Sequence, residues 1–165
     1  MSIYAADKLI SQARQLAAEY RRTMGKPLPG ISNEIALHDA IRLLKLTPVD
    51  ASVGGYDAVD PARDGLRIQI KSRTIFDESK TGQRIGQIKA EQPWDSVVLV
   101  LMDDNYEPYE IYEADRDDLL EFMEKSSSSR AKRGALSVAR FKMIGRLAWS
   151  RDEGLAPELW DNQTG

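Results

Sequence analysis

The stretch GYDAVDPARDGLRIQIKSR, residues 55–73, decides the fold that the sequence predicts. In its second half, apolar residues alternate with polar ones, which is typical of a β-strand with one buried face. These apolar residues are Leu66, Ile68 and Ile70. Pro61 and Gly65 are residues that favour a turn. We therefore expect an antiparallel hairpin between residues 52–60 and 66–72.

The polar residues of this hairpin gather on one face. Side chains two positions apart on a strand point the same way, so Gln69 and Lys71 share the face opposite the apolar side chains. If the two strands pair, Asp57 of the first strand lies close to both. Gly54 and Gly55 before it permit a close approach of backbone or ligand. The sequence thus brings a carboxylate, an amide and an ammonium group together.

A fourth polar residue, Glu34, lies on the helix predicted before the hairpin, which runs to about Lys45. The predicted core stripe of that helix contains Leu37, Ile41 and Leu44. Glu34 lies three residues before this stripe, so we expect its carboxylate to point inward, where it needs a partner. The alternative is that Glu34 only stabilises the first helical turn, by ~0.3–1 kcal/mol, wherever it points.

Further elements are predicted along the rest of the chain. We expect an amphipathic helix (4–22), a Pro/Gly break (25–30), a loop (74–83) and a short helix (84–91). Two strands (97–102 and 109–112), a helix from Asp115 and a flexible loop (125–130) follow. Residues 135–149 fit either a strand or a helix. The polar tail after Arg151 is expected to dock weakly, through Trp160.

This order of elements predicts an α/β (α+β) fold, in which a central mixed β-sheet is flanked by helices. A length of 165 residues suits one domain with a substantial core. Within residues 1–165 we expect three parts. These are an N-terminal helix and linker (1–30), a core (31–125) and a basic C-terminal extension (126–165).

Composition narrows the possible functions. The chain has no cysteine and one histidine, which excludes disulfides, thiolate metal sites and a multi-histidine zinc site within one chain. The longest apolar run, residues 97–102, is too short to cross a membrane, and the N-terminus does not resemble a signal peptide. We therefore expect a cytoplasmic protein with no membrane partner.

Charge is distributed unevenly, although the net charge is only −3. Residues 103–124 contain ten acids and one base, whereas residues 125–149 contain seven bases and no acid. One interpretation is a surface that attracts anions, with Arg130, Lys132 and Arg133 gripping DNA phosphates. The other is that the two segments neutralise each other in the folded chain.

Asp57, Gln69 and Lys71 on a hairpin, with Glu34 on the preceding helix, resemble the active-site motif of the PD-(D/E)xK nuclease superfamily. This superfamily includes restriction endonucleases and Holliday-junction resolvases. The segments NEIALHDAIRLL, GGYDAV and IQIKSR also resemble small bacterial proteins of unassigned function placed in it. The chain departs from the pattern at Gln69, where Glu or Asp is usual, and at Tyr56, where Pro is usual.

The resemblance implies a restriction endonuclease-like core and a metal-dependent DNA endonuclease that hydrolyses phosphodiester bonds. Asp57, Gln69 and Glu34 would hold Mg²⁺ or Mn²⁺, and Lys71 would assist the attacking water. Further residues would contact the nucleic acid: Ser72, Arg73 and Lys89. To cut both strands we expect a homodimer, acting alone or with a protein partner in a defence or repair system.

Two other hypotheses remain open. The first is a catalytically inactive module of the same fold that binds nucleic acid or a protein partner. Gln69 favours this hypothesis, because an amide removes one negative charge from the expected metal site. The second is an unrelated α/β domain.

Overall fold

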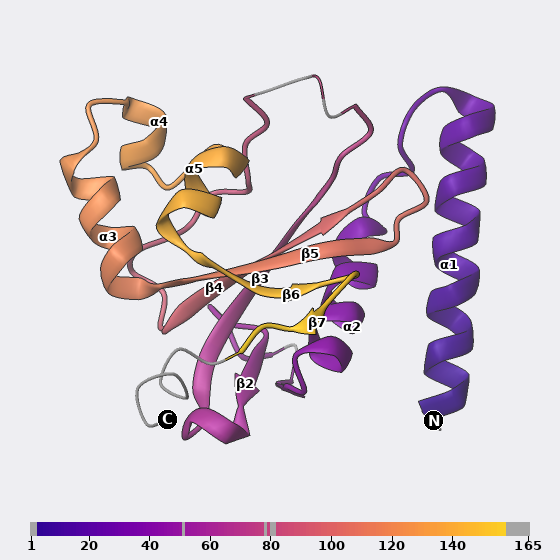
Figure 1. Cartoon of the computed structure of the whole chain (residues 1–165), viewed down its shortest axis with the longest axis horizontal. Helices are drawn as coiled ribbons and strands as arrows, with labels where there is room; N and C mark the ends of the chain where they lie inside the picture. The colour runs from indigo at the N-terminus through magenta and orange to yellow at the C-terminus, as the bar shows by residue number, and fades with distance from the viewer. Residues whose placement is uncertain (1–2, 51, 78, 80–81, 158–165) are drawn as a thin grey trace.

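The computed structural model describes residues 3–50, 52–77, 79 and 82–157. Its centre is a seven-stranded sheet whose strands lie side by side in chain order (Figure 1). The strands are β1 (Thr47–Pro48), β2 (Ala58–Asp60), β3 (Leu66–Thr74), β4 (Ser96–Met102), β5 (Pro108–Asp115), β6 (Arg146–Ser150) and β7 (Gly154–Leu155). β3 and β4 run parallel and the other neighbours are antiparallel, so the sheet is mixed, as predicted.

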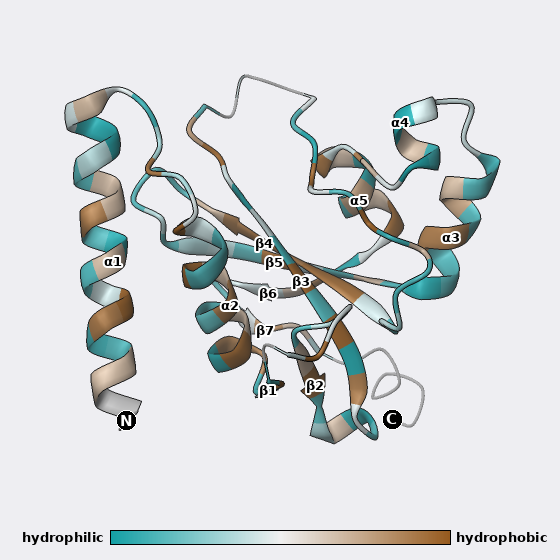
Figure 2. Cartoon of the chain, turned by 180° about the vertical axis from the view of Figure 1, so that it is seen from behind, coloured by the Kyte–Doolittle hydropathy of each residue, from teal (hydrophilic) through white to brown (hydrophobic). Residues whose placement is uncertain are grey.

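The helices divide between the two sides of this sheet (Figures 1 and 2). They are α1 (Ile3–Met24), α2 (Ser32–Leu43), η1 (Pro61–Arg63), α3 (Arg116–Lys125), α4 (Ser129–Lys132) and α5 (Val138–Ile144). α1 and α2 pack on one face, together with apolar side chains such as Ile68 and Val98. α3 and α5 pack on the other face, with Val97 and Leu99. We call these the α2 face and the α3 face.

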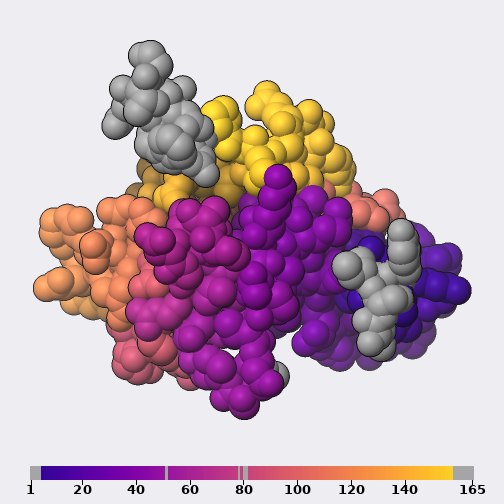
Figure 3. Space-filling model, turned by 90° about the horizontal axis from the view of Figure 1, so that it is seen from below, coloured from indigo at the N-terminus to yellow at the C-terminus, as the bar shows by residue number. Residues whose placement is uncertain are grey.

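The predicted hairpin is present, with a shorter first strand than expected. β2 has three residues, and its register pairs Ala58 with Ile68. The connection contains η1, where the Asp60 carboxylate accepts a hydrogen bond from the Ala62 amide at 2.9 Å. In Figure 3 the β1–η1 region lies between α1 on one side and the α3–α4 region on the other.

The helix predicted over residues 84–91 is wrong. This segment is irregular and runs beside residues 134–138, with an isolated bridge between Arg84 and Ser137. The Ile88 amide donates to the Gly134 carbonyl at 3.1 Å. A Cβ at Gly134 would lie 2.1 Å from the Ile88 carbonyl oxygen, so only glycine permits this close approach.

The C-terminal part of the chain also differs from the prediction. The expected flexible loop at 125–130 runs into α4, and the ambiguous stretch 135–149 forms α5 followed by β6. Because β6 pairs with β5, the sheet continues past residue 125, where we expected the core to end. Trp160 lies outside the described residues. In the described part of the chain, no helix is long and apolar enough to cross a membrane.

Candidate functional site

Asp57, Gln69 and Lys71 lie on the α3 face of the hairpin. Continuing the β2–β3 register from the pair Ala58–Ile68 places Asp57 opposite Gln69. The Asp57 amide donates to the Ile68 carbonyl at 2.8 Å, and its carboxylate accepts from the Ile70 amide at 2.8 Å. The Asp57 carboxylate therefore binds the β3 backbone at Ile70, just outside β2. Gln69 and Lys71, which the sequence predicts on the same face, lie beside it.

Lys71 occupies a partly desolvated position. Burial lowers the pKa of its ammonium group, the nearby charges of Arg73 and Lys89 lower it further, and the charge of Asp57 acts in the opposite direction. The ammonium group donates to the Gln87 carbonyl at 3.1 Å. A Cβ at Gly86 would lie 3.6 Å from the ammonium nitrogen, which is an ordinary van der Waals contact.

Gln69 is buried and its amide orientation is determined by its neighbours. The amide nitrogen donates to the Gly55 carbonyl at 3.2 Å and to Gln92 Oε1 at 3.1 Å. Because a backbone carbonyl only accepts, the nitrogen must face Gly55 and the oxygen must point away. Among the described residues, this buried oxygen, Oε1, has no hydrogen-bond partner. An unpaired buried carbonyl costs about 1–3 kcal/mol, which a water, a donor or a cation would offset.

Gly55 holds the loop before Asp57 against the segment that precedes β4. Its φ is +95°, and a Cβ would lie 2.5 Å from Cδ of Pro93. Both observations require glycine. The expected close approach at the two glycines is thus present at Gly55, and it is made by the chain's own backbone.

Glu34 does not point inward, so that expectation is wrong. It is exposed in the first turn of α2. The buried residues of this helix are Ile35, Ala36, Asp39 and Ala40. Of the predicted stripe, Ile41 and Leu44 are partly buried against the same core. The buried carboxylate is that of Asp39, which pairs with Arg14 at 2.8 Å. α2 also contacts β3 on the α2 face, opposite Lys71.

Other acidic side chains of the described residues do not replace Glu34 as an expected metal ligand. Within the described residues, no group of three or more His, Asp or Glu side chains lies close enough to hold a metal ion. The oxygen donors that the hairpin itself brings together are the Asp57 carboxylate and the Gln69 amide oxygen.

The residues expected to contact nucleic acid lie in three places. The hydroxyl of Ser72 is buried on the α2 face and donates to Asn33 Oδ1 at 2.8 Å. Arg73 lies beside Lys71, with its Nε donating to the Arg84 carbonyl at 2.5 Å, and burial lowers the pKa of its guanidinium. Lys89 is exposed nearby. Arg130, Lys132 and Arg133 are exposed at α4 and at its end.

Neutralisation by the acidic segment is observed for three of the seven bases of residues 125–149. Lys125, Lys142 and Arg146 form ion pairs with acids of the segment 103–124. Among the described residues, the other four bases have no carboxylate within ion-pair distance. These four are Arg130, Lys132, Arg133 and Arg140.

Two contributors to the site were missed in the sequence. Gln92 holds the Gln69 amide, and Arg84 connects the segment beside Lys71 to residues 134–138. Neither carries a sequence signal, because both act through contacts with residues distant in the chain.

Comparison with known proteins assigns no family. No protein-family model matches the chain, and no curated protein sequence matches it. The class that the fold defines is a mixed α+β protein with a seven-stranded sheet and helices on both faces.

Proposed function

We propose that this chain is a metal-dependent DNA endonuclease with a restriction endonuclease-like core, which hydrolyses phosphodiester bonds. One observation carries the proposal. A carboxylate, an amide oxygen with no partner among the described residues and a half-buried ammonium group share one face of a hairpin. The resemblance of the motif to PD-(D/E)xK nucleases supports the same conclusion.

The donor atoms suit a hard divalent cation. Mg²⁺ takes oxygen ligands, commonly one or two carboxylates together with waters and substrate phosphate. Asp57 offers a carboxylate and Gln69 offers Oε1, the buried oxygen without a partner. Glu34 is exposed in the first turn of α2, which packs on the opposite face of the sheet, so it does not join these donors. When bound, Mg²⁺ or Mn²⁺ supplies a Lewis acid for the phosphate and lowers the pKa of water.

Lys71 contributes a positive charge where negative charge develops during hydrolysis. As the water oxygen forms its bond to phosphorus and the leaving oxygen departs, negative charge grows on the phosphate oxygens. An ammonium group stabilises that charge more strongly in a partly desolvated place than in water. The lowered pKa of Lys71 also brings its proton closer to exchange with the water that it would orient.

The surroundings of Lys71 favour a polyanionic substrate. Arg73 and Lys89 add positive charge next to it, and the exposed bases of α4 add more. Such charges give affinity for the phosphate backbone without reading sequence. We propose DNA as the partner, and a homodimer where both strands are cut.

A second function is favoured by a specific observation. The two hydrogen bonds donated by Gln69 brace the loop at Gly55 and the side chain of Gln92, which is a structural role. On this proposal the chain is an inactive module that binds nucleic acid or a protein partner in a defence or repair system. Asp57 then serves only to bind the Ile70 amide.

Plasmid cleavage separates the two proposals. Supercoiled plasmid is incubated with Mg²⁺ or Mn²⁺ and the wild-type chain, Lys71→Ala or Asp57→Asn. Lys8→Ala, an exposed lysine of α1, is the matched control. We expect nicking or linearisation by the wild type and the control, and its loss in the two site variants. Cleavage that persists in both site variants contradicts the proposed site, while DNA binding without cleavage under either ion supports the inactive module.

A further inference from the structure

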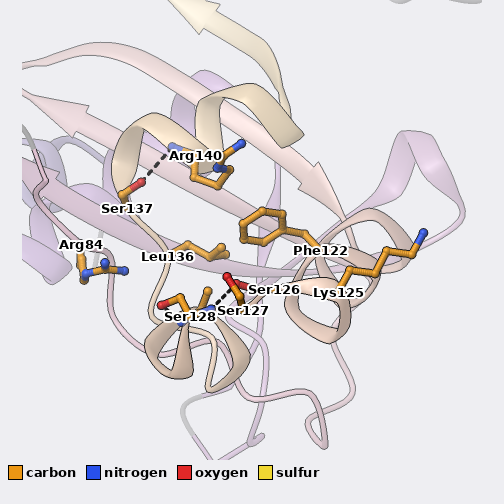
Figure 4. Close-up of a pocket in the computed structure, with 10 residues that line it drawn as sticks. Arg84, Phe122, Lys125, Ser126, Ser127, Ser128, Leu136, Ser137 and Arg140 are labelled. Carbon is orange, nitrogen blue, oxygen red and sulfur yellow. Dashed lines mark hydrogen bonds between the residues drawn. The ribbon is translucent and has the colours of Figure 1, made fainter.

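A pocket of about 450 Å³ opens between α3, α4, α5 and the segment that follows β3 (Figure 4). Its floor contains Phe122 and Leu136. Its rim carries Arg84, Lys125 and Arg140, and none of the described residues that line it is Asp or Glu. The pocket is therefore cationic in a chain whose net charge is −3.

Two of the three cations lack a carboxylate partner. Lys125 pairs with Glu121 at 2.6 Å, and both side chains are exposed. Arg140 lies over the ring of Phe122, 5.3 Å from its centroid, and Arg84 donates to the Ala135 carbonyl at 2.6 Å. Among the described residues, no carboxylate lies within ion-pair distance of either arginine. A guanidinium matches the geometry of phosphate oxygens, so both arginines suit a phosphate ligand.

Serine hydroxyls line the same pocket with their donors free. Ser137 Oγ accepts from the Arg140 amide at 3.1 Å, drawn as a dashed line in Figure 4. Ser126 Oγ accepts from the Ser128 amide at 3.2 Å, and Ser128 Oγ accepts from the Ala131 amide at 3.3 Å. In the described part of the chain, none of these three hydroxyls donates a hydrogen bond. Each hydroxyl has one proton to offer, so the pocket presents donors to a ligand that accepts.

The pocket is connected to the candidate catalytic face through one short segment. Lys71 bonds the Gln87 carbonyl and Arg73 bonds the Arg84 carbonyl. Gln87 lies three positions after Arg84 in the chain, so their Cα atoms are at most about 11 Å apart. This short segment therefore places the pocket close to the Lys71 ammonium group.

We propose that this pocket binds a phosphate group of the nucleic-acid strand, close to the phosphate that would lie at Lys71. The guanidinium groups of Arg84 and Arg140 bind its oxygens, and the serine hydroxyls donate to them. The position of this phosphate near a cleaved bond rests on the proposed nuclease function. Recognition of the phosphate does not, because it needs neither metal nor hydrolysis.

Binding of a labelled DNA oligonucleotide, followed by fluorescence anisotropy in EDTA, tests the pocket without cleavage. The full-length chain is compared with Arg84→Ala and Arg140→Ala. Arg22→Ala, an exposed arginine of α1, is the control with the same change in net charge. We expect each pocket variant to weaken binding roughly tenfold, as for loss of a charged hydrogen bond. The slope of log K against log salt should fall by about one, and the control should change neither.

Three outcomes are decisive. Equal effects of Arg140→Ala and Arg22→Ala overturn the proposal, because they indicate charge attraction without a site. Binding of inorganic phosphate that is lost in Arg140→Ala, without any binding of DNA, overturns the nucleic-acid ligand and indicates a small phosphate compound. A pocket effect on DNA binding with no cleavage under Mg²⁺ or Mn²⁺ supports the phosphate site while the nuclease proposal fails. Thermal unfolding of each variant verifies that it folds.

Discussion

Replacement of Gln69 by Glu tests whether the hairpin face is built to hold a cation. The Gln69 amide donates to the Gly55 carbonyl and to Gln92 Oε1, at 3.2 and 3.1 Å. A carboxylate has no hydrogen to donate, so the substitution removes both bonds and points negative charge at two oxygen acceptors. It also restores the acid that is usual at this position in PD-(D/E)xK nucleases.

The expected cost follows from these contacts. Two neutral hydrogen bonds contribute about 1 kcal/mol each, and the buried charge adds a further penalty that Lys71 partly offsets. We expect a loss of about 2–4 kcal/mol in the free energy of unfolding without metal. For a chain of this size, this loss lowers Tm by roughly 5–15 °C.

The assay is thermal unfolding of Gln69→Glu in EDTA and in excess Mn²⁺, beside Gln69→Met as a neutral control of similar length. Metal at 100 times its Kd stabilises the folded state by about 2.7 kcal/mol, so Mn²⁺ should recover most of the loss in Gln69→Glu. Gln69→Met loses the same two hydrogen bonds without gaining a ligand, and should respond less to Mn²⁺. An equal rise of Tm with Mn²⁺ in both variants would refute a metal site at this residue.

Three further predictions concern the surroundings of the site. Gly55→Ala should destabilise the chain by at least ~1–2 kcal/mol, because alanine disfavours positive φ and its Cβ would meet Pro93; urea unfolding with no change in midpoint would contradict this. Burial holds the pKa of Lys71 in the folded chain below its value in the unfolded chain. Between these two pKa values the unfolded state binds more protons than the folded state. The stability of the wild type relative to Lys71→Met should therefore rise with pH up to about 10.5. A flat difference between pH 8 and 11 would argue against a desolvated ammonium group. Asp39→Asn removes the buried charge partner of Arg14 and leaves it only the exposed Glu107 carboxylate, 3.4 Å away, so it should cost about 3–5 kcal/mol in urea unfolding; a loss below ~1 kcal/mol would mean that the pair does not anchor α1.

Local alternation was sufficient to predict which side chains of the hairpin lie together. The pattern of residues 66–71 determines which side chains of β3 share a face, and the turn residues place β2 opposite. Asp57, Gln69 and Lys71 were therefore brought together correctly from the sequence. Their partners were not predictable, because Gln92 and Gln87 reach the site through a segment without regular structure.

Two errors have a physical cause in long-range contacts. Ile85 and Ile88 have helical spacing, yet their amides bond the carbonyls of Leu136 and Gly134, about fifty residues away. The orientation of α2 was misjudged because its expected core stripe contained only apolar residues, whereas the observed one includes Asp39. Asp39 is fully buried there, since Arg14 of α1 neutralises it. Sequence periodicity predicts neither the pairing of residues 85–88 with residues 134–136 nor the Arg14–Asp39 ion pair.

The central claim is that Asp57 and Lys71 act together on a phosphodiester bond. A double-mutant cycle of single-turnover DNA cleavage with Mn²⁺ tests it most directly, using Asp57→Asn, Lys71→Ala and the double variant. Asn at position 57 still offers an oxygen to the Ile70 amide, so the hairpin is retained. We predict that each single substitution lowers the rate by roughly 10²–10³, and that the double variant is little slower than either single variant. Wild-type rates in both single variants, or losses that multiply fully in the double variant, would contradict a shared catalytic role.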